Sequence, residues 1–441
     1  MIVMKFGGTS VGDAKRIKQV SEIVTSQIKK KPIVIVSAFA GVTDALIKSS
    51  HATVRGNVSV KEIEKLHYSM LKDLNIDASL INEEINELKD ILDGVYSLKE
   101  LTPRTLDVIM SFGERMSAKI IASYMSKAGI PSKAYNSYDA GLITNSVFGD
   151  ADALPEAEKA IYNSFKKMKN GVPIVTGFIG KTKNGEITTL GRGGSDYTAS
   201  IIGAAVNAEE IQIWTDADGI MTADPKIVKD AKTIEYVSYD EAAELAFLGA
   251  KILHPKTILP AVKKNIPVRI LNTYNPSGKG TTILKNVKKK NSITSIAYKK
   301  GVKIINVHSP KMFLAYGFMA KIFDIFSGMK IPVDMISTSE VNLSLTVNGK
   351  YDTRMLIEEL KKIAEVKVYS NKVSISVVGN GIAQTPGIAG KIFDSIGENK
   401  INVEMISSGA SEINVSFVVD DKDSDKAVRL LHEAFFGEKN E

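Results

Sequence analysis

The chain has 441 residues, more than one ordinary domain contains, which predicts two or three domains. Its 44% apolar and 24% charged residues are typical of a globular protein, and because it contains no cysteine, disulfides, thiolate catalysis and zinc–thiolate sites are excluded. The formal net charge of +7 is modest, and the lysine runs at 29–31 and 288–290 carry no interleaved aromatic residues, so a nucleic-acid partner is not expected.

Histidine and the start of the chain exclude further classes. The five histidines lie at positions 51, 67, 254, 308 and 432, and none of them pair at the spacing of metal ligands. Residues 1–4 have the pattern of a strand, so no signal peptide is expected, and no uncharged apolar stretch reaches the length of a membrane span. The expected location is the cytoplasm, with no membrane partner.

Residues 1–285 alternate short apolar runs with helical patterns. Each candidate strand is rich in Val and Ile and is followed by Gly, Ser, Thr or Asp; the candidates are 2–5, 33–37, 172–176, 209–215 and 268–271. This alternation predicts a mostly parallel α/β sheet covered by helices, with ligands at the carboxyl ends of its strands. Residues 59–100 are charged with one apolar stripe, which predicts a packed helical insert.

The first strand leads directly into Lys5-Phe-Gly-Gly-Thr-Ser10. Glycine has no side chain, so backbone N–H groups at Gly7 and Gly8 can approach an anion, and Lys5 adds a positive charge. The pattern is neither the P-loop nor the dinucleotide-binding fingerprint. A phosphate-binding loop and an ordinary turn both fit these residues.

The densest motif is Thr189-Leu-Gly-Arg-Gly-Gly-Ser-Asp196, which follows a β-branched run and precedes a helical pattern. We expect Ser195 to cap that helix, with Arg192 and backbone donors at its N-terminus and Asp196 in its first turn. Such a helix start binds a carboxylate or phosphate. A capped turn without a ligand is the alternative, but it does not need an arginine between glycines.

A polar loop, Thr215-Asp-Ala-Asp-Gly-Ile-Met-Thr-Ala-Asp-Pro-Lys226, follows another buried strand. A calcium-binding EF-hand loop is excluded, because its glycine would be the sixth residue and Gly219 is the fourth. A nucleotide-binding loop and a plain turn fit equally well. Three weaker candidates share a position beside a strand end or on a helix: 37–43, 111–117 and 249–255.

After a Pro-, Gly- and Lys-rich stretch at 272–291, the chain repeats itself. Lys321-Ile-Phe-Asp324 recurs as Lys391-Ile-Phe-Asp394, and the block at 331–337 recurs at 401–407, both at an offset of 70 residues. A third block, 341–347, recurs at 413–419. Internal repeats determine architecture, and each repeat reads strand, helix, strand, strand, helix. The second repeat lacks a last strand, which we expect residues 293–298 to supply, while 365–370 closes the first.

The glycine motifs, the Thr215 loop and the two repeats, in this order, resemble aspartate kinase over essentially the whole chain. The resemblance implies an amino-acid kinase catalytic domain at 1–285, a linker at 286–300, and ACT domains of the βαββαβ ferredoxin-like type at 301–371 and 372–441. The implied activity is ATP-dependent phosphorylation of the β-carboxylate of L-aspartate, the first step of lysine, threonine and methionine biosynthesis, under feedback inhibition.

The resemblance also implies site residues. Lys5 and Asp196 are the expected catalytic residues, with Lys5 stabilising charge on the transferred group and Asp196 orienting lysine, substrate or hydrated metal. The expected ATP contacts are Lys5, Gly7, Gly8, Ser10, Thr215, Asp216, Met221, Lys226 and Lys251. The expected aspartate contacts are Ser37, Thr43, Glu114 and Arg192. Mg²⁺ is expected on the nucleotide phosphates and water, with no protein metal site.

For the repeats, the resemblance implies an effector site that takes an amino acid, with lysine favoured over threonine. The expected contacts are Met312, Ala315, Gly317, Phe318, Met319, Asp334, Ser339, Glu340 and Val341. A homodimer or homotetramer through the ACT domains is expected, because such domains leave sheet edges open. Two rival hypotheses stay open: another amino-acid kinase, acting on glutamate, acetylglutamate or carbamate, and a non-catalytic amino-acid sensor.

Overall fold

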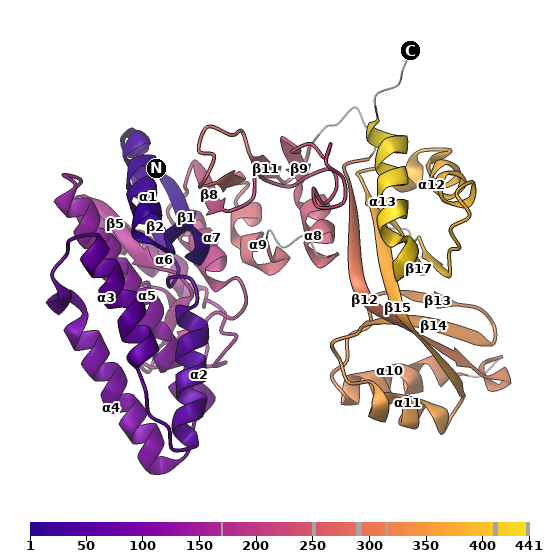
Figure 1. Cartoon of the computed structure of the whole chain (residues 1–441), viewed down its shortest axis with the longest axis horizontal. Helices are drawn as coiled ribbons and strands as arrows, with labels where there is room; N and C mark the ends of the chain where they lie inside the picture. The colour runs from indigo at the N-terminus through magenta and orange to yellow at the C-terminus, as the bar shows by residue number, and fades with distance from the viewer. Residues whose placement is uncertain (169–170, 249–252, 288–292, 314–315, 409–412, 438–441) are drawn as a thin grey trace. The chain divides into compact units, whose positions relative to one another are not determined.

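A computed structural model of the chain describes residues 1–168, 171–248, 253–287, 293–313, 316–408 and 413–437 (Figure 1). The chain forms two compact units, and each is composed of several segments. The first unit contains Met1–Ile220, Glu235–Tyr239 and Ile252–Val287. The second contains Met221–Ile234, Asp240–Lys251 and Lys288–Glu441. This division into two units does not test the predicted domain boundaries at 285, 300 and 371, which stay a prediction.

The first unit is built on an eight-stranded sheet with the order β3-β5-β2-β1-β8-β10-β11-β9. The five predicted strands are confirmed, and they form consecutive parallel neighbours: β5 (Val172–Thr176), β2 (Pro32–Val36), β1 (Ile2–Phe6), β8 (Glu210–Thr215) and β10 (Val268–Asn272). The sequence patterns did not predict the outer strands β3 (Ser132–Tyr135), β11 (Thr281–Leu284) and β9 (Tyr236–Ser238). Among the described strand pairs of this sheet, β10–β11 is antiparallel and the others are parallel.

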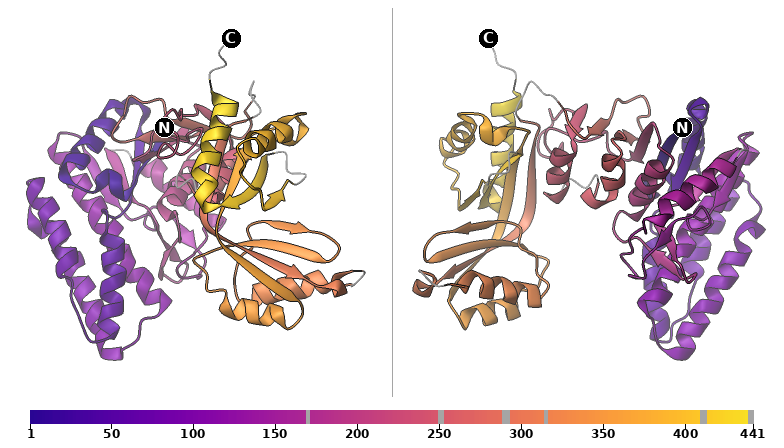
Figure 2. Two further views of the ribbon diagram at one scale, coloured as in Figure 1. Left: turned by 45° about the vertical axis from the view of Figure 1, so that its right-hand side comes forward. Right: turned by 180° about the vertical axis from the view of Figure 1, so that it is seen from behind.

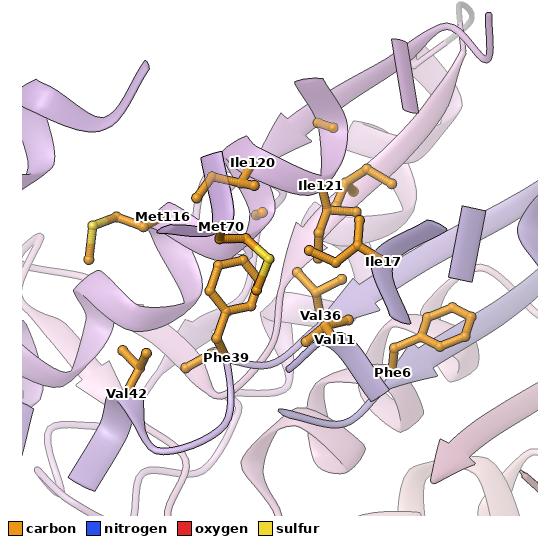
Figure 3. Close-up of a cluster of buried hydrophobic side chains, with 14 of the residues drawn as sticks. Phe6, Val11, Ile17, Val36, Phe39, Val42, Met70, Met116, Ile120 and Ile121 are labelled. Atoms are coloured by element: carbon orange, nitrogen blue, oxygen red, sulfur yellow. The ribbon is translucent and has the colours of Figure 1, made fainter. Parts of the chain in front are cut away.

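Helices cover both faces of the sheet. On one face, the side chains of Ile2, Met4 and Phe6 join the buried cluster shown in Figure 3. This face is covered by α1 (Ala14–Ser26), α2 (Val42–Val54), α3 (Lys61–Asp73), α4 (Asn82–Leu98) and α5 (Pro103–Lys127). Side chains alternate along a strand, so Val3 and Lys5 point to the other face. That face is covered by α7 (Gly194–Ala205), which packs against α6 (Glu156–Lys167) and α9 (Pro255–Lys263).

Shorter elements complete this unit. The three-stranded sheet is formed by β4 (Ile143–Thr144), β6 (Ile179–Thr182) and β7 (Ile187–Thr189). Single 3-10 turns occur at η1 (Gly8–Val11), η2 (Ile28–Lys30) and η3 (Ala78–Ile81). The predicted helical insert at 59–100 is confirmed as α3, η3 and α4, and Ile85, Leu88 and Leu92 of its apolar stripe are buried in the core.

The insert carries a buried histidine that makes stability depend on pH. His67 is 0% exposed, and its Nδ1 lies 2.8 Å from the carbonyl oxygen of Ile63, so Nδ1 donates that hydrogen bond. Its Nε2 finds no partner among the described residues. Burial lowers the pKa of His67 to about 4, although the hydrogen bond to Ile63 opposes the shift. The folded chain therefore keeps this ring neutral below the ordinary pKa, whereas the unfolded chain protonates it.

We expect acid to destabilise the protein through His67 between pH 6.5 and pH 4. Folding excludes a proton that the unfolded chain binds, so lowering the pH from 7 to 5 should cost about 2 kcal/mol of unfolding free energy. Thermal unfolding followed from pH 7 to pH 5 should show a shallower decline for His67→Leu. His51→Leu, at an exposed histidine of α2, is the matched control and should keep the wild-type slope. Equal slopes for all three proteins would contradict the assignment.

The second unit contains a six-stranded antiparallel sheet with the order β13-β14-β12-β15-β17-β16. Two 14-residue strands lie at its centre, β12 (Ser295–His308) and β15 (Glu365–Val378), and Figure 2 shows them running through both halves of the unit. The outer strands are β13 (Ile336–Thr338), β14 (Asn342–Asn348), β16 (Met405–Ser407) and β17 (Asn414–Asp420). The helices are α8 (Tyr239–Phe247), α10 (Phe318–Gly328), α11 (Arg354–Lys361), α12 (Ile388–Gly397) and α13 (Asp421–Phe436), with η4 (Pro310–Met312) and η5 (Ile382–Gln384).

The long strand β12 takes part in both halves of this sheet. The prediction for residues 293–298 is confirmed, because 295–299 pair antiparallel with 374–378, at the start of the second repeat. Residues 365–368 pair in turn with 305–308 of the first repeat, which confirms the closing strand of that repeat. The second half of the sheet therefore needs residues that precede the first repeat, whereas the first half is closed by its own last strand. The pairing shifts register near Gly301, whose φ of +70° favours glycine.

The segment 221–234 belongs to the second unit by its packing. Ala223 and Val228 are buried in the same apolar cluster as α12, α13 and the second half of β15. The Tyr298 hydroxyl donates to Asp224 Oδ2 at 2.9 Å, and Thr222 Oγ1 lies 2.9 Å from His432 Nε2. The polar loop after β8 is therefore divided between the two units at residue 220.

Candidate functional site

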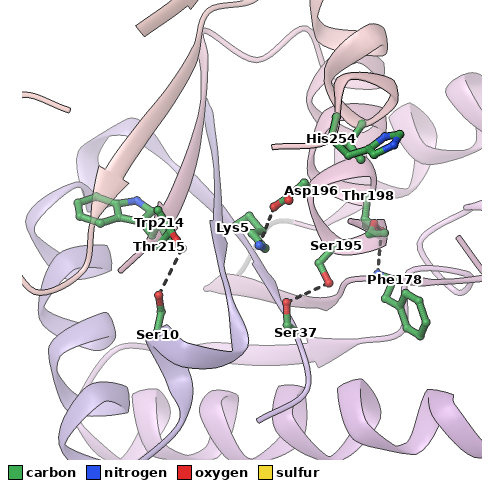
Figure 4. Close-up of polar contacts among 12 residues, drawn as sticks. Lys5, Ser10, Ser37, Phe178, Ser195, Asp196, Thr198, Trp214, Thr215 and His254 are labelled. Carbon is green, nitrogen blue, oxygen red and sulfur yellow. Dashed lines mark hydrogen bonds and ion pairs between the residues drawn. The ribbon is translucent and has the colours of Figure 1, made fainter. Parts of the chain in front are cut away.

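Lys5 and Asp196 form an ion pair in the first unit. Lys5 lies near the carboxyl end of β1 and faces α7, where Asp196 occupies the first turn (Figure 4). Lys5 Nζ lies 2.6 Å from Asp196 Oδ1, and the two side chains are only 11% and 12% exposed. Opposite charges this close and this shielded hold each other in one orientation. The ammonium group is thereby fixed beside the glycine loop that follows β1.

Contacts to neighbouring strands hold that glycine loop in place. A Cβ on Gly8 would lie 2.9 Å from the carbonyl oxygen of Ala38, so the close approach of the two backbones requires glycine. Ser10 Oγ lies 2.7 Å from Thr273 Oγ1 and donates to the carbonyl oxygen of Trp214 at 3.3 Å. The N–H of Gly7 also donates to Trp214. This last bond corrects the expectation that the Gly7 N–H is free for an anion.

The second glycine motif forms the start of α7, but its capping differs from the prediction. Gly193 is the N-cap residue with φ of +72°, and no side chain caps the helix. The predicted cap by Ser195 is wrong because the helix begins two residues earlier, which places Ser195 inside the first turn. Its Oγ accepts a hydrogen bond from Ser37 Oγ at 3.0 Å instead. The N–H of Gly194 donates to the Gly191 carbonyl.

Arg192 is exposed in the loop before α7, and it has neither an ion pair nor a hydrogen bond with any residue in the described part of the chain. A guanidinium presents a rigid fork of donors that matches a carboxylate. An unpaired arginine beside a helix N-terminus is therefore suited to hold an anionic group of a substrate.

Glu114 is a buried carboxyl group in the middle of α5, only 3% exposed. Its Oε1 accepts from the Ala38 N–H at 3.0 Å, while Oε2 has no hydrogen-bond partner among the described residues. Burial raises the pKa of Glu114 to about 8, against the opposing effect of the Ala38 hydrogen bond. A buried carboxyl with a free oxygen is suited to bind a cationic group, which would restore its ionised form.

The remaining predicted residues of this unit lie at element ends. Thr43 is half-buried in the first turn of α2, after Gly41 with φ of +81°. Thr215 ends β8, and its hydroxyl donates to Asp216 Oδ1 at 3.1 Å. The strands β1, β2 and β8 are parallel neighbours, so these ends lie at one edge of the sheet, as predicted.

Two predicted nucleotide contacts belong to the second unit, and a third lies outside the described residues. Met221 and Lys226 belong to the second unit, where the Lys226 N–H donates to Asp224 Oδ1 at 2.9 Å. Lys251 lies outside the described residues. Their contacts with a nucleotide stay a prediction.

In the second unit, five predicted effector residues line one pocket of about 280 Å³. They are Met312, Phe318, Met319, Ser339 and Glu340. Phe313 and Thr338 also line it and were not predicted. The apolar residues come from η4 and α10 and the polar ones from the turn between β13 and β14. The pocket therefore offers an apolar wall opposite a carboxylate.

The other predicted effector residues that the structure describes lie outside this lining. Asp334 Oδ2 is paired with Lys299 Nζ at 2.6 Å, and the carboxylate is largely shielded. Gly317 is the N-cap of α10 with φ of +78°, and the Val341 carbonyl accepts from the Ser309 N–H. Ala315 lies outside the described residues. The pairing of Asp334 with Lys299 was not foreseen, because Lys299 belongs to the strand that crosses between repeats.

Two family models match the chain: the amino acid kinase family over residues 1–272, and the ACT domain over 305–354 and 375–435. Among curated relatives, aspartokinase 2, chloroplastic, from Arabidopsis thaliana is 39% identical over 458 residues, covering 98% of this chain and 84% of the relative. The chain belongs to the aspartokinase family. Its predicted activity, aspartate kinase, is confirmed at the level of the family, and so is its fold of kinase domain and ACT domains.

Solved structures of the family resemble this aspartokinase over its full length. E. coli aspartokinase III in complex with aspartate and ADP, in its R-state, has a TM-score of 0.81 at 31% identity and covers 99% of this chain and 100% of that chain. The same enzyme with lysine and aspartate, in its T-state, has a TM-score of 0.84 at 31% identity, covering 99% of each chain.

Sequence reasoning missed polar residues that support the site of this aspartokinase. Thr273 contacts Ser10, and Asp107 contacts the strand before Arg192. Neither stands in a recognisable motif, so the sequence carried no signal for them. No described helix combines the length and apolarity that crossing a membrane requires. The cytoplasmic location stays a prediction, since the Arabidopsis relative is named as chloroplastic.

Proposed function

We propose that this aspartokinase binds ATP and aspartate at the carboxyl edge of β1, β2 and β8, between the Lys5 loop and the start of α7. The observation that carries the proposal is the Lys5–Asp196 pair at 2.6 Å beside a glycine loop. Lys5 and the loop hold the ATP phosphates, and Thr215 and Asp216 lie along the nucleotide. Asp196 keeps the ammonium group of Lys5 directed at the transferred phosphoryl group.

Aspartate is held at its two backbone charges. Glu114 receives the ammonium group at its free Oε2, and Arg192 receives the α-carboxylate, while Ser37 and Thr43 complete the pocket. The β-carboxylate is already ionised near pH 7, given a reference pKa of about 3.9, so it needs no general base. The protein contributes by positioning two anions and stabilising charge during transfer.

Mg²⁺ is proposed to be held by the ATP phosphates and water. No cluster of three acidic or histidine side chains suited to a metal occurs in the described part of the chain, and Asp196 already has Lys5 as its cationic partner. Mg²⁺ commonly retains waters and binds through substrate phosphates, so these residues fit such an ion. When bound, it neutralises charge on the phosphates.

The effector is proposed to be lysine, bound in the pocket of the first repeat. Its side-chain ammonium would contact Glu340, and its methylene chain would pack on Met312, Phe318 and Met319, a lining that suits an apolar chain with a charged end. The E. coli relative, described in complex with lysine, supports this choice. A homodimer or homotetramer through this unit is proposed because its sheet ends in the outer strands β13 and β16, and such sheet edges commonly pair between subunits.

Aspartate-dependent ADP formation tests the proposal. The purified chain, assayed with Mg-ATP, should form ADP only when aspartate is present, and lysine should inhibit it. Phosphorylation of glutamate, acetylglutamate or carbamate in place of aspartate would contradict the substrate, and absence of turnover with lysine binding retained would indicate a sensor. Inhibition by threonine alone would contradict the assigned effector.

A further inference from the structure

We infer that Asp107 is a positioning residue that fixes the distance between the two groups which recognise the backbone of aspartate, and so determines aspartate affinity. This inference rests on the proposed roles of Glu114 and Arg192. Asp107 lies in α5, is only 1% exposed, and touches neither the reacting atoms nor the glycine loop at Lys5. It acts on the substrate through the backbone segments that it holds.

Asp107 uses both carboxylate oxygens on two separate segments. Its Oδ2 accepts from the Thr189 N–H at 2.8 Å and from the Gly149 N–H at 2.9 Å. Its Oδ1 accepts from the Thr189 hydroxyl at 2.8 Å. Charged acceptors in a buried place make strong hydrogen bonds, and such bonds resist displacement by water. The end of β7 is therefore attached to helix α5 by two hydrogen bonds, and a third attaches the loop at Gly149 to the same carboxylate.

The attachment point lies three residues before Arg192. Between them, Gly191 is packed so closely that a Cβ there would lie 2.6 Å from Asp150 Oδ1 and 3.1 Å from the Gly149 carbonyl oxygen. Gly149 is itself held by Asp107. The loop that presents Arg192 thus receives its position from Asp107 on both sides. Arg192 has no partner of its own in the described chain, so this support has to come from the backbone.

The other recognition group is on the same helix as Asp107. Glu114 follows Asp107 by seven residues, which is about two turns and about 10 Å along the axis, so the two carboxyl groups share one face of α5. One rigid helix therefore carries the ammonium-binding group and the anchor of the carboxylate-binding group. Loss of the Asp107 hydrogen bonds should move Arg192 relative to Glu114. The glycine loop after Lys5 should stay unchanged, because Ser10 attaches it to Trp214 and Thr273.

Steady-state kinetics of Asp107→Asn separate this role from general stability. The amide keeps the size of the side chain but replaces one acceptor by a donor facing backbone N–H groups. We expect kcat/KM for aspartate to fall about 10- to 100-fold, mainly through KM, with KM for ATP unchanged. Thr189→Val removes one of the three bonds and should give a smaller effect in the same direction.

Glu84→Gln is the control for a disturbed α5, because Glu84 is buried and paired with Lys119 of that helix. It should lower the melting temperature while leaving KM for aspartate unchanged. An unchanged aspartate KM in Asp107→Asn, or equal changes in both substrates' KM, would overturn the inference. Arg192→Ala and Glu114→Gln are measured alongside: if these do not raise the aspartate KM, the proposed substrate site fails, whereas failure of Asp107→Asn alone overturns only its positioning role.

Discussion

Replacement of Lys5 by methionine should reduce aspartate-dependent ADP formation about 1,000-fold or more. Methionine has a similar length but no charge, so the transferred phosphoryl group loses the donor that Asp196 holds at 2.6 Å. Removing a single preorganised donor from a charge-stabilising site costs about 100- to 1,000-fold in turnover, and a phosphate-binding lysine also supports ground-state binding. Turnover with Mg-ATP and aspartate measures the effect, and lysine binding to the second unit should persist.

Stability has to be separated from catalysis in this experiment. Lys5→Met leaves Asp196 with a shielded, unpaired charge, which destabilises the fold. The double variant Lys5→Met with Asp196→Asn removes that charge and should recover thermal stability without recovering activity. Lys18→Met, at an exposed position of α1, is the matched control and should keep full activity. Turnover of Lys5→Met within a few-fold of wild type would exclude Lys5 from phosphoryl transfer.

Replacement of Glu114 by glutamine should lower kcat/KM for aspartate about 100-fold, because an amide cannot balance the substrate's ammonium charge in a buried place. The wild-type enzyme should also show a pH dependence with a defined sign. Burial raises the pKa of Glu114 to about 8, so the empty site holds it protonated at pH 7. Aspartate binds the ionised form. Its affinity should therefore increase about tenfold for each unit by which the pH is raised towards 8, and it should become constant above pH 8.

Calorimetry in buffers of different ionisation enthalpy checks this directly. Aspartate binding at pH 7 should release about one proton in the wild type, and the pH dependence and proton release should both be absent in Glu114→Gln. Glu83→Gln, at an exposed glutamate of α4, should behave as wild type. A Glu114→Gln enzyme that retains the wild-type pH slope would contradict the assignment of that slope to Glu114.

Much of this molecule follows from local sequence patterns. Short Val- and Ile-rich runs ending in small or polar residues predicted the five consecutive parallel strands, because a strand buried on both faces needs a continuous apolar run. The repeated blocks predicted two similar α/β repeats. The missing last strand of the second repeat predicted that residues 293–298 join its sheet, and 295–299 do so by pairing with 374–378. Lys5 and Asp196 were identified by motifs that stand next to such strands.

Local sequence patterns did not predict the contacts of several other residues. Asp107 resembles any polar residue on a helix until the fold places Thr189 and Gly149 against it. Asp334 was predicted as an effector contact, yet the strand crossing between repeats brings Lys299 to it at 2.6 Å. Similarly, the pattern of residues 215–226 describes one loop, whereas packing of Ala223 and Val228 assigns its second half to the other unit.

Local sequence patterns were sufficient to predict the five central strands, the helical insert, the repeats and the charged residues that flank the strand ends. Those features depend on backbone propensity, side-chain periodicity and turn chemistry, which act over a few neighbouring residues. Which charges are paired and which stay free depends instead on how the chain folds, which leaves Arg192 and one oxygen of Glu114 without partners among the described residues while Asp196 holds Lys5. Which charged side chains pair depends on the sheet face and the chain crossovers that bring distant segments together. Burial then determines the protonation state of groups such as Glu114 and His67.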